Sequence, residues 1–502
     1  MDAFVPEVAP PPLLECRDLT KRYGATVALD RFTVSLAAGR IVGLLGPNGS
    51  GKTTLLKMIA GVAHPTAGDI RVAGYEVGPE SKALVSYLPE RPYFSRSMRV
   101  REMIAFFADF YEDFDAALAR DMLARLGVPE DAPTSALSKG TVEKVQLTLV
   151  MARHAALYLL DEPIGGVDPA ARVHHPFHPP RARRGGVSGR LHPAALWPDA
   201  SARARGLRDP GEGHDAGRVL PRGVPMLGKL FAQEMRALVK PAAIMLAIMV
   251  VAGVVGIGCI EATDAVSRAA GFASRYVNEA SAASNLTVVL VMAALFCAFL
   301  VWTSLVAVYV FIAMRFYRTM FTDEGYLTLT LPVRTGALVT AKFCAAFLLA
   351  AVFTLAACAL ASLAVLAISD GDGDMVSVVL SLLGGWSALT GSGGVASSVI
   401  GVANALVSAA YTVGLAFLSL TLGAWWARRH KVAAAVALYV GIGWVISLLF
   451  SIVGVLAMMG DTGTASFMLG TVSVMQTVVN LAVAAGGVAL SAYLVRAKVD
   501  LS

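Results

Sequence analysis

Residues 46–53 read Gly46-Pro47-Asn48-Gly49-Ser50-Gly51-Lys52-Thr53 and match the pattern GxxxxGK[ST]. In this pattern the glycines let backbone N–H groups point at phosphates, the lysine reaches the β and γ oxygens, and the hydroxyl ligates Mg²⁺. The preceding run Arg40–Leu45 predicts a buried strand, and the following Leu55, Met58 and Ile59 predict an apolar helix. The stretch therefore predicts a nucleoside triphosphate site in an α/β domain.

A second predicted strand, Ala156–Leu160, ends in the acids Asp161 and Glu162. A carboxylate after such a strand is the acidic partner of a phosphate loop and holds Mg²⁺. The neighbouring Glu162 is placed to polarise an attacking water. Two acids that only cap a strand are the alternative, which the phosphate loop disfavours.

The composition requires lipid around much of the chain. Of 502 residues, 56% are hydrophobic and 16% charged, whereas a soluble domain is nearer a quarter charged. This excludes a wholly cytosolic enzyme, a disordered chain and a secreted disulfide scaffold. The five cysteines form no CxxC pair. The net charge of +6 lies mainly at the ends of apolar spans and in one unusual segment, which indicates a membrane and no nucleic acid.

Six apolar stretches reach the length of about 20 residues that a bilayer-spanning helix needs. They lie near residues 241–260, 286–314, 343–368, 396–425, 432–459 and 471–495. The distribution of Lys and Arg places both ends of this part, and the ATP site, in the cytoplasm. A shorter stretch near 376–388 is predicted to be interfacial or re-entrant. No carboxylate or Lys lies deep inside a span, which disfavours a proton- or sodium-coupled carrier.

A third motif indicates a family. Leu137-Ser138-Lys139-Gly140-Thr141 precedes a helical run and lies 24 residues before Asp161. Together with the phosphate loop and the two acids, it makes residues 13–172 resemble the nucleotide-binding domain of an ABC transporter. The resemblance implies an α/β P-loop NTPase domain, here truncated, followed by an all-α transmembrane domain of six helices.

The resemblance also implies roles for single residues, with ATP and Mg²⁺ as cofactors. Tyr23 is expected to stack on adenine, and Ser138 and Gly140 to contact the γ-phosphate bound by a partner subunit. Asp168 is expected in the loop that crosses the dimer. The catalytic candidate is Glu162, and the Mg²⁺ candidates are Thr53, Asp161 and Glu90. The ATP-binding candidates are Tyr23, Gly46, Pro47, Asn48, Gly49, Ser50, Gly51, Lys52, Thr53, Thr54, Glu90, Ser138, Gly140 and Asp168.

Two positions depart from the family pattern. The signature reads LSKGT rather than LSGGQ, and Glu90 occupies the position of the lid glutamine. Both changes affect γ-phosphate sensing rather than ATP binding.

The part from Met226 onward resembles an ABC-2-type permease, with six spans and a long first cytoplasmic loop. That loop, residues 315–332, is expected to form a coupling helix that docks on the ATPase. An amphipathic loop at the lipid surface is the alternative.

Residues 173–225 do not fit either part. They hold nine Arg, eight Pro, eight Gly and five of the eight His, but no Lys and no Ile. Reading one nucleotide downstream permits Val-Val-Ser-Thr at 189–192 and Ile-Leu-Glu-Lys-Gly-Thr-Met at 209–215, which resemble the closing strands of ABC ATPases. We interpret the segment as an out-of-frame or disordered junction. His192 lies near the expected switch position, but its neighbours belong to the wrong frame, and it is not assigned a catalytic role.

The predicted organisation is a disordered leader (1–12), a truncated ATP-binding domain (13–172), the junction (173–225) and a permease domain (226–502). The leading hypothesis is an ATP-driven ABC transporter, an exporter of an unknown substrate. It is multi-pass in the cytoplasmic membrane, in contact with lipid, and acts as a homodimer or with a related ABC subunit. The alternatives are a frameshifted fusion with impaired hydrolysis and a non-transporting ABC ATPase fused by error.

Overall fold

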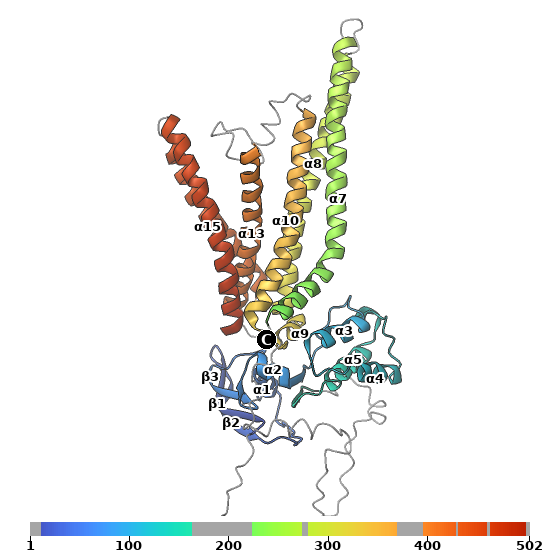
Figure 1. Ribbon diagram of the computed structural model, residues 1–502, viewed down its shortest axis with the longest axis vertical. Coiled ribbons are helices and arrows are strands. Elements are labelled where there is room, and N and C mark those ends of the chain that lie inside the picture. Colours follow the sequence, from blue (N-terminus) through green and yellow to red (C-terminus); the bar gives the residue numbers. More distant parts are fainter. Residues whose placement is uncertain are drawn as a thin grey trace, which may run out of the picture. The chain divides into compact units, whose positions relative to one another are not determined.

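The computed structural model of the chain describes residues 12–162, 223–273, 280–368, 395–427, 430–458 and 462–497 (Figure 1). Contacts divide the chain into two compact units. The first comprises Met1–Met226, Arg318–Thr335 and Ala497–Ser502, and the second comprises Leu227–Tyr317 and Gly336–Arg496. The loop Arg318–Thr335 lies between two long apolar helices in the sequence but packs in the first unit.

An antiparallel sheet in the order β2-β1-β3-β4 begins the first unit. Its strands are β1 (Leu14–Tyr23), β2 (Thr26–Leu36), β3 (Ala67–Val72) and β4 (Tyr75–Glu76). The register of β1 shifts between Cys16 and Leu19, around Asp18 with its φ of 47°. Because a bulge adds one residue, it keeps both apolar side chains on the buried face although they are three positions apart.

A separate pair of parallel strands carries the first acid of the ATP site. Strand β5 (Val85–Leu88) pairs with β6 (Leu157–Leu160) from Val85↔Leu157 to Leu88↔Leu160. All four residues of β5 are buried, and the Ser86 hydroxyl donates to the Val150 carbonyl oxygen at 2.9 Å. Strand β6 confirms the predicted strand ahead of Asp161.

The predicted strand Arg40–Leu45 is not formed, and the prediction that it is buried was wrong. Ile41 is 103% exposed and Leu45 is 93% exposed. The physical reason is that a strand of a parallel sheet forms only when its backbone groups pair with a neighbour. Within residues 12–162 no strand pairs with this run, and the sheet of β6 contains only β5.

The helices of the first unit cover the strands and contribute an aromatic core. They are α1 (Lys52–Ile59), α2 (Pro79–Leu84), α3 (Val100–Phe110), α4 (Ala116–Arg125), the 3₁₀ turn η1 (Thr134–Ala136), α5 (Lys139–Met151) and α9 (Glu324–Leu329). Helix α3 buries Phe106, Phe107 and Phe110, and the rings of Phe106 and Phe110 lie 4.8 Å apart. The Asp115 carboxylate starts α4 by accepting from the N–H groups of Ala117 and Leu118.

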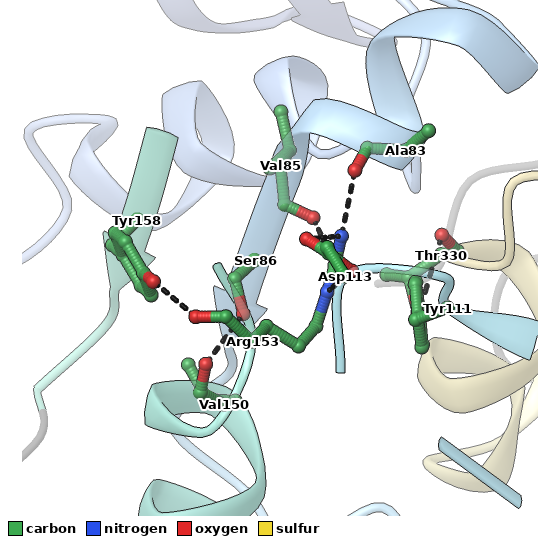
Figure 2. A network of polar contacts seen from close by, with 9 residues as sticks. All are labelled: Ala83, Val85, Ser86, Tyr111, Asp113, Val150, Arg153, Tyr158 and Thr330. Atoms are coloured by element: carbon green, nitrogen blue, oxygen red, sulfur yellow. Dashed lines mark hydrogen bonds and ion pairs between the residues drawn. The ribbon is translucent and has the colours of Figure 1, made fainter. Parts of the chain in front are cut away.

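A buried arginine joins these elements (Figure 2). The Arg153 side chain is 2% exposed, and its guanidinium donates twice to the Asp113 carboxylate at 3.0 Å. It also donates to the carbonyl oxygens of Val85 at 2.6 Å and Ala83 at 2.7 Å. The Tyr111 ring centroid lies 3.8 Å from the guanidinium carbon. The segments before β5, after α3 and after α5 therefore depend on one side chain.

The second unit contains six candidate membrane spans among the described residues, as predicted. Its helices are α7 (Gly223–Ala273), α8 (Ala280–Phe321), α10 (Thr335–Ile368), α13 (Val395–Trp426), α14 (Lys431–Met458) and α15 (Thr462–Ala497). Many of their large apolar side chains are exposed; along α14, for example, Val436, Val440 and Leu449 are 56%, 58% and 59% exposed. Lipid is the medium that such exposed apolar helices require. The short stretch near 376–388 lies outside the described residues.

One cluster of charges joins three helices of the second unit. Glu234 of α7 accepts from Arg315 of α8 at 3.1 Å and pairs with Lys342 of α10. The side chains of Glu234 and Lys342 are 15% and 5% exposed. Both lie near the ends of their helices, and each buried charge has its counter-charge, as burial requires.

Candidate functional site

Two glycines shape the phosphate loop. Gly49 and Gly51 have φ values of 83° and 88°, which other residues rarely adopt. A Cβ on Gly51 would lie 2.3 Å from the Ala28 carbonyl oxygen, so this position accepts only glycine. Helix α1 begins directly afterwards, and its first N–H groups lack intrahelical partners, which favours an anion at this end.

The Lys52 ammonium lies over the loop. It donates to the carbonyl oxygens of Gly46 at 2.8 Å and Pro47 at 2.9 Å. Since these acceptors are neutral and the site is exposed, phosphate oxygens can replace them as stronger, charged acceptors.

Thr53 and Asp161 meet although 108 positions separate them. The Thr53 hydroxyl donates to Asp161 Oδ1 at 3.0 Å. Asp161 is 4% exposed, and its Oδ2 is buried without a hydrogen-bond partner among the described residues. Burial raises the pKa of this carboxyl, and the nearby Glu90 and Glu162 raise it further, while the bond from Thr53 opposes the rise.

This arrangement fits Mg²⁺. The ion prefers hard oxygen donors and keeps several waters, so a hydroxyl, one carboxylate oxygen and nucleotide phosphates are a suitable set. A bound cation, or a water molecule of its shell, would supply the partner that the buried Oδ2 of Asp161 lacks among the described residues.

The other acids flank Asp161. Glu162 is exposed and has a φ of 49°, an uncommon left-handed conformation for a non-glycine residue. Glu90 is exposed beyond the end of β5, and its charge raises the pKa of Asp161. The structure thus brings Lys52, Thr53 and Asp161 together, with both glutamates nearby.

The remaining predicted residues lie elsewhere. Tyr23 ends β1 with a half-buried ring, and the Lys21 ammonium lies 5.0 Å from the ring centroid. Ser138 is the N-cap of α5 and accepts from the Thr141 N–H at 3.2 Å, with Gly140 in the same first turn. Ser138 is exposed. Among the described residues, no hydrogen bond connects it to this chain's own phosphate loop. Asp168 and His192 lie outside the described residues.

Residues 29–165 match the sequence profile of the family described as ABC transporter. This stretch is an ABC transporter ATP-binding domain. The ABC transporter ATP-binding protein YtrB of Bacillus subtilis (strain 168) is 32% identical over 162 residues, which are 32% of this chain and 56% of YtrB. The Nod factor export ATP-binding protein I of Burkholderia orbicola (strain AU 1054) is 34% identical over 168 residues, which are 32% of this chain and 55% of that protein.

A solved ATP binding subunit of an ABC transporter is 31% identical; the match covers 32% of this chain and 70% of that subunit, with a TM-score of 0.29. The chain spans about half the length of the curated relatives it matches.

Helix α9 packs on this ABC transporter ATP-binding domain, within the first unit. The Lys82 ammonium donates to the Leu329 carbonyl oxygen at 2.5 Å, at the last turn of α9. The Tyr326 ring centroid lies 6.4 Å from that of Tyr87 and 5.3 Å from the Lys57 ammonium. The predicted docking helix of the loop is therefore present and in contact with the ATP-binding domain.

The lysines of this contact were not identified from the sequence. Burial lowers the pKa of Lys82 to about 8 and also lowers that of Lys57, which the Asp161 carboxylate partly opposes. Lys57 lies on α1, which begins at the phosphate loop, and it senses both Asp161 and Asp323 before α9. The sequence places Lys57 about one and a half helical turns after Lys52. That position alone does not reveal the contact with Tyr326, which lies 269 positions further along the chain.

Proposed function

We propose that the chain is a subunit of an ATP-driven transporter in the cytoplasmic membrane that exports its substrate. The observation that carries the proposal is the buried Asp161 carboxylate on the hydroxyl of the phosphate loop, in one chain with six helices apolar enough to span a membrane. The docked α9 supports coupling between the two parts. The export direction is supported by relatives described as Nod factor export proteins.

We assign the residue roles from the geometry around Lys52, Thr53 and Asp161 and from the resemblance to ABC ATPases. Lys52 and the loop 46–54 bind the phosphates of ATP, and Tyr23 stacks on adenine. Thr53 and Asp161 hold Mg²⁺ with Glu90 in reach of its shell, and Mg²⁺ neutralises phosphate charge when bound. The exposed Glu162 polarises the attacking water.

The active assembly is a dimer, either of this chain or with a related ABC subunit. The exposure of Ser138 at the start of α5 leaves it accessible to ATP bound by another subunit, and Gly140 and Asp168 are assigned to the same interface. The ATP-binding domain and both termini face the cytoplasm, where the ATP is. An ABC-2-type permease is the identity we propose for the second unit.

The exposed run Ile41–Leu45 supports the interpretation that residues 173–225 are out of frame. An ATP-binding domain with an unpaired, apolar run beside its phosphate loop is expected to bind ATP but to hydrolyse it near background. A non-transporting ABC ATPase fused by error is less consistent with export proteins among the relatives and with the contact of α9.

The test uses the full chain in lipid nanodiscs and, separately, the two chains obtained when the reading frame is restored. Lys52→Ala should weaken binding of ATP with Mg²⁺ by at least tenfold. The exposed Arg71→Ala should leave it unchanged, because Arg71 lies in β3 and its hydrogen bonds go to Gly74 and Glu76. The restored pair should hydrolyse ATP about 100-fold faster than the single chain, the typical worth of one transition-state contact. Equal ATP binding by Lys52→Ala and the unaltered chain would refute the proposed site.

A further inference from the structure

The most unusual surface of the first unit is a group of exposed apolar side chains beside the ATP site. Along the run 41–45, Ile41 and Leu45 are almost fully exposed, with Val42 at 56% and Leu44 at 39%. Leu160, at the end of β6, is 38% exposed. We call these residues and β6 the acceptor edge. They lie outside the candidate membrane spans, so lipid does not account for their exposure.

The two sides of the acceptor edge approach each other at one end. The run 41–45 leads into the phosphate loop, and β6 leads into Asp161. Beyond the phosphate loop, the Thr53 hydroxyl donates at 3.0 Å to Asp161, which directly follows β6. Both segments therefore end at the same edge. Among the described residues, β6 pairs only with β5, and the run 41–45 pairs with no strand.

The opposite side of this small sheet is already covered. All four residues of β5 are buried, and the Val85 carbonyl oxygen accepts from Arg153. A further strand is accommodated only on the side of β6 that faces residues 41–45. Because β5 and β6 are parallel, we take the further strand to be parallel as well. It must then be apolar on both faces, because strands inside parallel sheets are.

The sequence that follows β6 in this chain has the opposite chemistry. Residues 173–225 hold nine Arg and eight Pro and no Ile. Proline cannot donate to a strand ladder, and charged side chains oppose burial on both faces. The curated relatives are nearly twice as long as the part that matches this chain.

We propose that the acceptor edge binds a strand supplied by a second polypeptide, namely the carboxyl-terminal part of an ABC ATP-binding protein. The strand inserts between residues 41–45 and β6 and completes the sheet in trans. Because parallel strands end at the same edge, the residue that follows the inserted strand arrives beside Asp161 and the phosphate loop. The nucleotide site of this chain thus becomes complete only in the complex. The inference rests on the proposed function for the identity of the domain.

Co-expression of the full chain with defined fragments tests the proposal. One fragment is encoded by codons 173–225 of the same gene, read one nucleotide downstream, and the other is the part of YtrB that follows its matched residues. At least one fragment should purify with the full chain, and amide hydrogen exchange at 41–45 and 157–160 should slow by at least tenfold. The double variant Ile41→Lys/Leu45→Lys should weaken fragment binding at least tenfold.

A matched control is Val27→Lys, which adds the same charge at an apolar residue of β2 that is 45% exposed. It should leave fragment binding unchanged, and unaltered exchange in β1 and β3 shows that each variant is folded. The proposal is overturned if neither fragment slows exchange at the acceptor edge. It is also overturned if residues 41–45 are already protected in the chain alone, whether by its own residues or by a second copy. ATP binding, measured on the same samples, reports separately on the proposed function.

Discussion

Replacing Arg153 by methionine should destabilise the ATP-binding domain more than any exposed charge replacement. The substitution removes two hydrogen bonds to Asp113, two to the backbone carbonyls of Val85 and Ala83, and the contact with the Tyr111 ring. Breaking a buried ion pair by removing one partner costs about 3–5 kcal/mol. The Asp113 side chain is 18% exposed and can be partly rehydrated, so we expect about 4 kcal/mol.

Native-state hydrogen exchange on the full chain measures this effect within the first unit. The free energy of opening at the β5 and β6 amides should fall by about 4 kcal/mol, because Arg153 bonds the backbone where β5 begins. The control Arg101→Met removes an ion pair with Asp131 whose side chains are 55% and 71% exposed, and it should cost less than about 1 kcal/mol. A loss below about 1 kcal/mol for Arg153→Met would show that the network in Figure 2 does not stabilise the domain.

Three further predictions concern α9 and the metal site. Burial lowers the pKa of Lys82 to about 8, so between pH 8 and about 10.5 the folded protein has lost the Lys82 proton while the unfolded chain keeps it. The free energy of unfolding of the first unit should therefore increase by about 3 kcal/mol from pH 7 to 10.5. Urea unfolding measures this increase, and Lys82→Met should remove it. Tyr326→Ala should reduce lipid-stimulated ATP hydrolysis by the frame-restored pair severalfold while ATP affinity stays within twofold; unchanged stimulation would contradict a coupling role for α9. Burial raises the pKa of Asp161, so its proton competes with Mg²⁺, and the affinity for Mg²⁺ should fall as the pH is lowered; a pH-independent affinity in isothermal titration would contradict this.

The phosphate loop could be predicted because its geometry is local. Gly49 and Gly51 adopt left-handed conformations within a stretch of eight residues, and the pattern specifies them. The six membrane spans were also predictable, since length and apolar composition determine whether a helix can cross a bilayer. The family resemblance predicted from the motifs agrees with the match of residues 29–165 to the ABC transporter family.

The errors and omissions concern contacts between distant parts of the sequence. The apolar run Arg40–Leu45 has the composition of a strand, but strand formation depends on neighbours that its own residues cannot specify. The same limit applies to Lys82 on Leu329 and to the cluster around Glu234, whose members come from separate helices. Such pairs become visible only when the tertiary structure brings them together.

The most direct test of the ATP site is the effect of Mg²⁺ on the affinity of the full chain for ATP. With excess EDTA, the unaltered chain and Asp161→Asn should bind ATP equally, because Asp161 contacts the metal and not the nucleotide. Addition of Mg²⁺ should tighten ATP binding at least tenfold in the unaltered chain and in the exposed-site control Asp131→Asn, and not in Asp161→Asn. An equal effect of Mg²⁺ in all three proteins would contradict the assignment of Thr53 and Asp161 as the metal site of an ATP-driven transporter.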